Sequence, residues 1–214
     1  MATSKQKEIF LQEEGDAWFD RNHQVIQNID YGKTDPVVPV IKSCLSSICG
    51  EAKLLEIGCS EGKRLQWISQ NLPIQCHGVD PSSKAISVAK KSGVHAIQGT
   101  ADSLPFESDT FDFLVFGFCL YLCDRQDLFK IAYEADRVLK KEAWLVIHDF
   151  FAKSNEKRDY CHQPNVYSYK MDYRTIFDWH PSYTCVNHRI KHHQNQNFTD
   201  DVDEWTGISL LRKK

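Results

Sequence analysis

The 214-residue sequence lacks the features that mark secreted or membrane-spanning proteins. Its first residues, MATSKQKEIFLQEEGD, hold no apolar h-region and no cleavage-like stretch, so we expect no secretory signal. The longest apolar candidate, from Phe111 to Cys123, is too short to span a bilayer and contains Asp112. These absences predict a cytoplasmic protein without membrane insertion.

Cysteine is frequent, but its spacing indicates no disulfide framework and no metal site. The chain has 8 cysteines and no Cys-x-x-Cys pair. Without a secretory signal, disulfides are not expected, and the spacings match no four-ligand zinc pattern. We therefore expect small buried apolar cysteines and predict no bound metal.

An excess of positive charge is also missing. Lys and Arg number 26 against 29 Asp and Glu, which leaves a formal net charge of -3. Proteins that bind nucleic acid concentrate Lys and Arg, so we predict no nucleic-acid partner and a small-molecule substrate instead. A chain of 214 residues suffices for one domain with a sizeable core. The oligomeric state stays open.

Short apolar strands alternate with helices through the middle of the chain, and helices come before them. Expected strands cover 53–57, 74–79, 94–98, 111–116, 144–148, 183–191 and 204–211; expected helices cover 5–29, broken near Gly15, one from Asp35-Pro36 to Gly50, and 62–71, 82–91 and 126–139. This rhythm predicts an α/β fold with a doubly wound, mostly parallel seven-stranded sheet and a C-terminal antiparallel hairpin.

We expect a single domain over 1–214. Within it, residues 1–50 form N-terminal helices, 51–149 the core that binds a cofactor, 150–182 an inserted lid over the substrate, and 183–214 the hairpin.

The ends of the expected strands carry residues suited to a ligand site. Gly58 and Gly62 follow the first strand and let the chain turn tightly before a helix. Asp80 follows the second strand, 80 − 58 = 22 residues after Gly58, close to the ~20 expected for an acid that binds ribose hydroxyls. A turn glycine or a helix-capping acid alone is common, but suggestive residues at four successive strand ends indicate a ligand site.

Together these stretches resemble the class I S-adenosylmethionine-dependent methyltransferases over about 53–150. LLEIGCSEG resembles motif I and GVDPS resembles motif II, while QGTADSLPFESDTFD and ADRVLKKEAWLVIHDF are similar to the segments that follow. Ser60 replaces the middle glycine of motif I, and Thr100 stands where many members have Asp. The resemblance implies S-adenosylmethionine as the cofactor. EGDAWFDRN, GFCLYLCD and SYKMDYRTIFDWHPSYT are also similar to bacterial methyltransferases of surface-polysaccharide biosynthesis.

The resemblance implies a part of the cofactor for each matching segment. Glu56 and the turn 58–62 approach the methionine part, Asp80 the ribose, and residues 100–102 the adenine. Arg21 is a candidate partner for the cofactor carboxylate, or else an exposed helix residue. The full implied set is Arg21, Glu56, Gly58, Cys59, Ser60, Gly62, Asp80, Pro81, Thr100, Ala101, Asp102, Phe116, Gly117 and Phe118.

Candidates for catalysis and substrate binding follow the later strands. His148 and Asp149 end the fifth strand, and His148 is the better general base because its ordinary pKa lies near neutrality. The alternative is that Asp149 caps a turn while His148 packs against the sheet. Aromatic and polar side chains suit a sugar or another polar ring, unless they form an ordinary surface cover; the substrate candidates are Tyr121, His162, Tyr167, Tyr169 and Lys170.

The predicted function is methyl transfer to a small polar acceptor, such as a sugar hydroxyl or amine in surface-glycan biosynthesis. One alternative is a non-catalytic module that binds S-adenosylmethionine. Another is an NAD-dependent oxidoreductase, against which the spacing argues: the glycines read Gly-x-x-x-Gly rather than GxGxxG.

Overall fold

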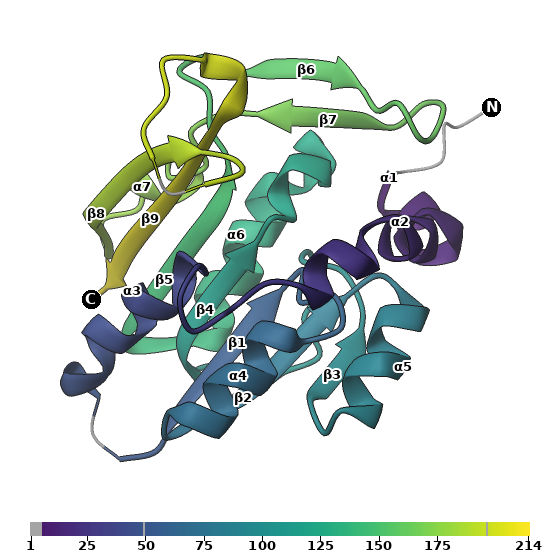
Figure 1. The fold of residues 1–214 in the computed structure, drawn as a ribbon. Helices are drawn as coiled ribbons and strands as arrows, with labels where there is room; N and C mark the ends of the chain where they lie inside the picture. The colour runs from purple at the N-terminus through teal and green to yellow at the C-terminus, as the bar shows by residue number, and fades with distance from the viewer. Residues whose placement is uncertain (1–5, 49, 196) are drawn as a thin grey trace.

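The computed structural model describes residues 6–48, 50–195 and 197–214 and shows a layered α/β fold (Figure 1). A seven-stranded sheet has the order β3-β2-β1-β4-β5-β9-β8. Its first five members run parallel, and β9 lies antiparallel between β5 and β8. This confirms the predicted fold class. The strands are β1 (Ala52–Ile57), β2 (Ile74–Asp80), β3 (His95–Gln98), β4 (Phe111–Gly117), β5 (Leu139–Phe150), β8 (Tyr183–His192) and β9 (Trp205–Lys213).

Helices cover both faces of the sheet, so its central strands are apolar on both sides. One face carries α3 (Val37–Cys44), α4 (Lys63–Asn71) and α5 (Ser83–Lys91). The other carries α6 (Leu128–Val138) and the short α7 (Thr175–Asp178). In α6, buried Ile131, Ala135 and Val138 recur at intervals of four and three residues, which is the stripe of a helix packed on a sheet.

The N-terminal segment is one continuous helix rather than two. It runs through α1 (Gln6–Ile9), a π-helical turn η1 (Phe10–Glu14) and α2 (Gly15–Gln27). A Cβ at Gly15 would lie 2.5 Å from the carbonyl oxygen of Phe10 and 3.1 Å from the amide nitrogen of Ser82. Gly15 therefore marks a close approach between this helix and the loop after β2, and not a break.

The next helix begins where the sequence predicts but ends earlier. The helix predicted to begin at Asp35-Pro36 does so, because Asp35 Oδ1 accepts the N–H groups of Val37 and Val38 at 2.9 Å. That helix ends at Cys44, followed by the 3-10 turn η2 (Leu45–Ser47), instead of reaching Gly50.

The segment 150–181, in which the sequence shows no clear period, contains a separate hairpin. Its strands are β6 (Glu156–Asp159) and β7 (Tyr167–Lys170), and they lie above the main sheet next to the N-terminal helix (Figure 1). Short 3-10 turns, η3 (Leu120–Leu122), η4 (Arg125–Asp127) and η5 (Val202–Glu204), complete the elements. No helix in the described ranges is long and apolar enough to cross a membrane.

Candidate active site

A cavity opens at the carboxyl ends of β1, β2 and β4, where the strand order of the sheet reverses. Its empty space, with the open mouth included, is about 840 Å³. The wall made by the strand-end loops is called the floor, and it includes Gly58, Asp80, Pro81, Thr100, Ala101, Asp102, Gly117 and Phe118. The N-terminal helix, residues 6–27, is called the roof and contributes Lys7, Phe10, Gly15 and Trp18.

The turn after β1 needs glycine for two reasons. Gly58 has φ +78°, and a Cβ there would lie 2.7 Å from Cys119 Cβ. Its N–H donates to the carbonyl of Val79 at 2.8 Å. Ser60, with φ +48°, donates its N–H to Asp80 Oδ2 at 2.8 Å. The turn is therefore tied to β2 and to the acid that ends it.

Asp80 offers acceptor capacity toward the cavity that it lines. Its Oδ1 accepts the N–H of Ser82 at 2.9 Å, and its Oδ2 accepts that of Ser60. Burial raises the pKa of Asp80 to about 6. Because a carboxylate oxygen has two lone pairs, both oxygens can accept a second hydrogen bond, for example from a pair of hydroxyls.

A buried charged cluster lies directly behind the same turn. Glu56, 2% exposed, pairs with Arg64, whose Nε is 2.9 Å from Asp35 Oδ2. Burial raises the pKa of Glu56 to about 7, although the Arg64 charge opposes the rise. Glu56 Oε2, Ser60 Oγ and Glu61 Oε1 have no hydrogen-bond partner among the described residues. Such buried acceptors call for a donor, and a primary ammonium is a suitable one.

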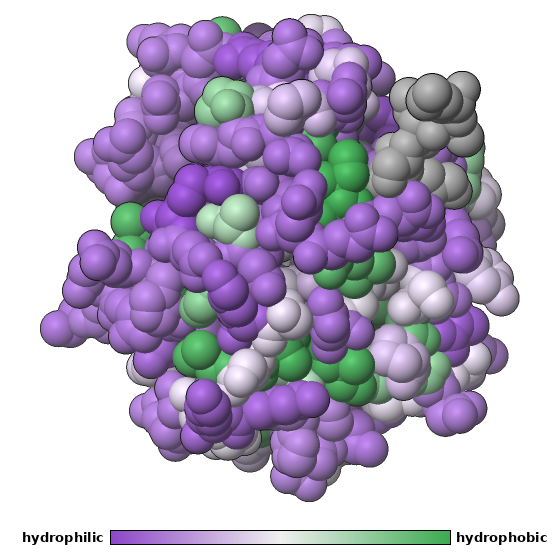
Figure 2. Space-filling model, turned by 90° about the vertical axis from the view of Figure 1, so that its right-hand side faces the viewer, coloured by the Kyte–Doolittle hydropathy of each residue, from purple (hydrophilic) through white to green (hydrophobic). Residues whose placement is uncertain are grey.

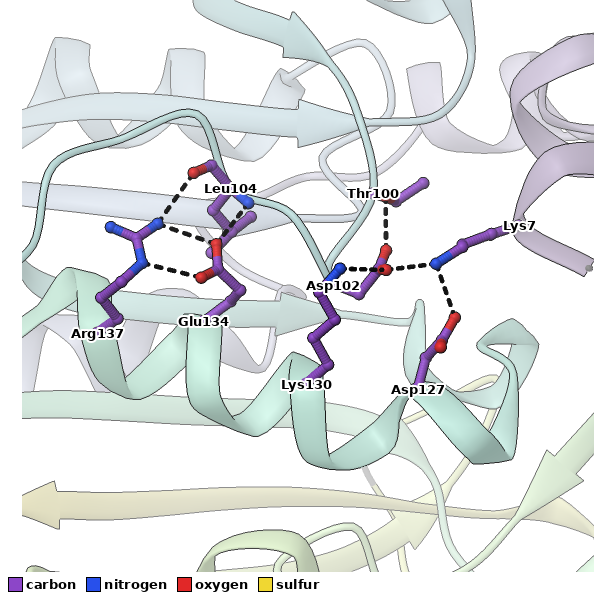
Figure 3. Close-up of polar contacts among 8 residues, drawn as sticks. All are labelled: Lys7, Thr100, Asp102, Leu104, Asp127, Lys130, Glu134 and Arg137. Carbon is purple, nitrogen blue, oxygen red and sulfur yellow. Dashed lines mark hydrogen bonds and ion pairs between the residues drawn. The ribbon is translucent and has the colours of Figure 1, made fainter.

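The loop after β3 is held from the roof (Figure 3). The Lys7 ammonium pairs with Asp102 and lies 2.9 Å from Asp127 Oδ2. Thr100 donates its hydroxyl to Asp102 Oδ1 at 2.7 Å, and Lys130 is 3.4 Å from Oδ2. Burial alone would raise the pKa of Asp102, but hydrogen bonds from Lys7 and Thr100 outweigh burial and lower it. Sequence reasoning missed Lys7, since no motif marks it.

A second brace holds the same loop to α6 (Figure 3). Glu134 accepts the N–H of Leu104 at 2.7 Å. Arg137 donates to Glu134 and to the carbonyls of Leu104 and Phe106, at 3.0 and 2.7 Å. These bonds replace the regular secondary structure that the loop lacks, and they fix the edge of the cavity.

The roof touches all three cofactor-side loops through polar contacts. Lys7 reaches the loop after β3, as described above. Asp16 accepts the hydroxyls of Ser82 and Ser83, at 2.7 and 2.9 Å, at the start of α5 after β2. His23 Nδ1 lies 2.6 Å from Glu61 Oε2 in the turn after β1. The roof position is therefore linked to the conformation of each loop.

Residues 55–147 match the family model described as a methyltransferase domain. The uncharacterized methyltransferase YcgJ of Bacillus subtilis is 32% identical over 117 residues, which is 51% of this chain and 45% of YcgJ. The chain spans about half the length of the curated relatives it matches, 45% of YcgJ and 57% of protein MJ1123 from Methanocaldococcus jannaschii. Over this part of its length the chain is therefore similar to methyltransferases.

Solved structures of other proteins show the same fold. A SAM-dependent methyltransferase from Methanosarcina mazei superposes with a TM-score of 0.65 and 18% identity, covering 82% of this chain and 97% of that one. The 1,6-didemethyltoxoflavin-N1-methyltransferase of Burkholderia thailandensis, with 1,6-didemethyltoxoflavin and S-adenosylhomocysteine bound, gives 0.73 and 13%, covering 100% and 92%. These results show that the chain shares the fold of methyltransferases that use S-adenosylmethionine. The orphaned oxygens around Glu56 and the free acceptor capacity of Asp80 fit that molecule.

The implied cofactor residues divide into two groups. Eight line the cavity, as the floor defined above. Cys59, Ser60 and Gly62 belong to the turn, behind the lining. Phe116 lies in the core, fully buried, with its ring 6.3 Å from that of Phe177. Side chains alternate along β4, so Phe116 points to the opposite face of the sheet from Gly117.

Arg21 is not among the residues that line the cavity. It pairs with Glu14 on its own helix and donates to the Tyr160 hydroxyl at 3.1 Å. Its link to the cofactor carboxylate remains a prediction.

The two catalytic candidates point to opposite faces of β5. The ring of His148, 5% exposed, lies 4.4 Å from that of Phe118, and neither nitrogen has a partner within residues 6–48, 50–195 and 197–214. Burial lowers the pKa of His148 well below its usual value. Asp149 accepts the N–H groups of Leu120 and Phe150 at 2.8 Å, and burial raises its pKa to about 7. Asp149 thus caps η3, the arrangement named above as the alternative.

Two of the predicted substrate residues, Tyr121 and Tyr167, contact the roof, and a third, Tyr169, contacts Arg125 in η4. Tyr121 is buried, and its hydroxyl accepts the Trp18 Nε1–H at 3.2 Å. Tyr167 exchanges two 2.9 Å hydrogen bonds between its backbone and the side-chain amide of Gln6. Tyr169 lies under Arg125, whose guanidinium carbon is 4.2 Å from the ring centroid.

The other two lie further out. His162 is exposed and contacts the ring of Tyr160 at 5.2 Å. The Lys170 ammonium donates to the carbonyl of Asp203 and lies 5.0 Å above the ring of Phe150. The described residues hold no group of three or more His, Cys, Asp or Glu side chains placed to bind a metal.

Proposed function

We propose that the protein transfers a methyl group from S-adenosylmethionine to a hydroxyl or amino group of a small polar acceptor. A sugar of a surface glycan is the acceptor that the sequence favours. One observation carries the proposal: loops from four strands converge on one cavity that Asp80 lines, and the orphaned acceptors lie behind the turn at Gly58 that lines it as well. The Burkholderia neighbour, named as an N1-methyltransferase, binds a small compound, which supports a small acceptor.

Positioning is the main task of the residues around the cavity. Bound S-adenosylmethionine supplies a methyl group on a sulfonium, which is already an activated leaving group. In the proposal, Asp80 holds the ribose hydroxyls, Glu56 faces the ammonium, and residues 100–102 frame the adenine. Alignment of the acceptor with the methyl group then supplies much of the acceleration.

His148 is the proposed proton acceptor. Its lowered pKa keeps the imidazole in the neutral form that can accept a proton at physiological pH, and also makes it a weaker base than a free imidazole. In the proposal, the cofactor would supply the methyl group, and His148 would take up the proton that the acceptor hydroxyl or amine loses. The Phe118 ring lines the cavity and its centroid lies 4.4 Å from that of the His148 ring, which places His148 next to the cavity. Asp149 acts in support, by holding η3 and the end of β4.

Calorimetric titration with S-adenosylhomocysteine tests the cofactor assignment. Asp80→Asn should weaken binding at least tenfold, since a hydrogen bond to a charged group contributes about 1.5–3 kcal/mol. Asp200→Asn, an exposed change in the loop before η5, should leave affinity unchanged. Affinity equal in both variants, or no binding at all, would refute the proposal.

Transfer of a labelled methyl group distinguishes an enzyme from a binding module. We expect label on a hydroxyl or amine among sugars, amino sugars and phenols, and no binding of NAD. His148→Gln should lower the transfer rate without changing S-adenosylhomocysteine affinity. Tight cofactor binding with no transfer to any acceptor would favour the non-catalytic alternative.

A further inference from the structure

Two aromatic side chains line the cavity near its β4 end, where Trp18 bonds to Tyr121 and Phe118 follows the strand. Trp18 lines it from the roof and Phe118 from the end of β4. The sheet order β3-β2-β1-β4 places the loop after β3, with Asp102, at the other end. Because the proposed adenine-binding residues occupy that far end, Trp18 and Phe118 flank the end left for the acceptor.

The orientation of Trp18 is fixed by a specific partner. Its Nε1–H donates to the Tyr121 hydroxyl at 3.2 Å. Tyr121 is 9% exposed and belongs to η3, which Asp149 caps. Burial raises the pKa of Tyr121, so its hydroxyl is neutral and accepts this bond through an oxygen lone pair. The chain therefore positions the Trp18 ring through a buried hydrogen bond and not through packing alone.

Phe118 is held in a conformation that non-glycine residues rarely adopt. Its φ is +54°, and its N–H donates to the carbonyl of His148 at 2.8 Å. Three rings surround it, with centroids 4.4 Å away for His148, 5.2 Å for Phe150 and 5.7 Å for His193. A strained backbone of this kind costs of order 1–3 kcal/mol and occurs preferentially at ligand sites.

We infer that Trp18 and Phe118 form a clamp for an acceptor that contains a ring with an apolar face. This inference rests on the proposed function and narrows its acceptor. Two oriented rings bind a ligand through face contact, as aromatic side chains do with aromatic rings and with the C–H faces of sugars. An acyclic amine or acid offers no such face. A sugar and an aromatic compound share the required chemistry, and the experiment separates them.

A ligand-observed NMR screen on the full chain saturated with S-adenosylhomocysteine tests the clamp. The cyclic probes are phenol, 4-hydroxybenzoate, methyl β-D-glucopyranoside and N-acetylglucosamine, and the acyclic ones are ethanolamine, glycolate and glycerol. We expect binding among the cyclic probes only. Binding by the sugars alone identifies a sugar acceptor, and binding by the phenols alone an aromatic one; either result supports the clamp.

Matched variants locate the binding. Trp18→Leu and Phe118→Leu should each weaken probe binding at least fivefold, while Phe129→Leu, a 78% exposed phenylalanine on α6, should not. Far-ultraviolet circular dichroism and thermal unfolding of each variant confirm that the fold persists. Three results would overturn the clamp and leave the proposed function standing. The wild-type chain could bind no cyclic probe, it could bind the acyclic probes equally well, or the cyclic probes could still bind to both clamp variants. Failure of the wild-type chain to bind S-adenosylhomocysteine would overturn both.

Discussion

The floor and the roof enclose the same cavity but are built in different ways. The floor consists of turns that continue directly from buried strands, so its backbone is set by the sheet. The roof is joined to the floor by side-chain contacts at Lys7, Asp16 and His23. Each such contact contributes about 0.5–1.5 kcal/mol. We therefore expect the roof to move when a ligand enters, while the floor keeps its shape.

Like the roof, the β6–β7 hairpin is joined to its neighbours by side-chain contacts. The amide of Gln6 bonds to both the N–H and the carbonyl of Tyr167, as a neighbouring strand would. Trp18 and Tyr121 form a further link, from the roof to the end of β4. The roof thus connects the cofactor loops with the residues around the proposed acceptor, and we expect the acceptor site to be complete only when the roof is docked.

The largest effect should come from adding one methyl group to the floor. Gly58→Ala combines φ +78° with a Cβ 2.7 Å from Cys119 Cβ, so the free energy of unfolding should fall by about 2–4 kcal/mol. Gly93→Ala is a matched control, because Gly93 has φ +80° but no atom within 4 Å of the added Cβ. It should cost about 1–2 kcal/mol. Equal losses in chemical denaturation would show that the floor is not tightly packed here.

The second effect concerns the pH dependence of the affinity for S-adenosylhomocysteine, which the carboxyls of Asp80 and Glu56 should cause. The pKa values of Asp80 and Glu56 are raised to about 6 and about 7, so each carboxyl is protonated below its pKa and ionised above it. Ionised carboxylates accept hydrogen bonds more strongly. Affinity for S-adenosylhomocysteine should therefore fall as the pH drops from about 8 to about 5, by up to about tenfold per unit below each pKa.

Calorimetry over that pH range provides the measurement. Asp80→Asn should remove the part of the dependence that lies near pH 6. An affinity that is flat with pH in the wild type would mean that these carboxyls do not contact the ligand.

A smaller effect is expected when the roof is loosened near the adenine end. Lys7→Met removes the ion pairs with Asp102 and Asp127, but Asp102 keeps Thr100 and Lys130. The Lys7 side chain is 24% exposed, so we expect a loss of only about 1–2 kcal/mol of stability. S-adenosylhomocysteine should dissociate several times faster, as measured by stopped flow. Lys33→Met, at an 84% exposed side chain, is the control; an unchanged dissociation rate for Lys7→Met would separate the roof from cofactor exchange.

The smallest effect should appear where the roof meets the hairpin. Gln6→Ala removes the two bonds to Tyr167, so amide hydrogen exchange in β6 and β7 should accelerate. Affinity for S-adenosylhomocysteine should stay within about twofold, because the one cavity-lining contact that the change removes among the described residues is the bond from Gln6 to the carbonyl of Leu122, outside the floor residues named above. Gln12→Ala, an exposed glutamine in the π-helical turn, should change neither quantity. A large loss of cofactor affinity in Gln6→Ala would contradict the division into two regions.

The elements of the floor were predictable because each has a local cause. Buried strands are continuous apolar runs, and the Asp35-Pro36 start of α3 is a local capping pattern, so both appear in the sequence. The hairpin in 150–181 was missed because β6 is exposed and polar, with no apolar face to reveal its period. The π-helical turn before Gly15 was missed because its cause is the loop after β2, far away in the sequence.

By itself, the sequence determined the sheet class, the order of strands and helices, and the turns at Gly58 and Asp80, since all of these depend on the periodicity and conformational limits of neighbouring residues. The tertiary structure alone decided that Lys7 reaches Asp102, that Trp18 faces the same cavity as Phe118, and that Asp149 and His148 point to opposite sides. Those relations join residues up to about a hundred positions apart. Only the packing of the whole chain brings such residues together, because no local preference records a distant partner.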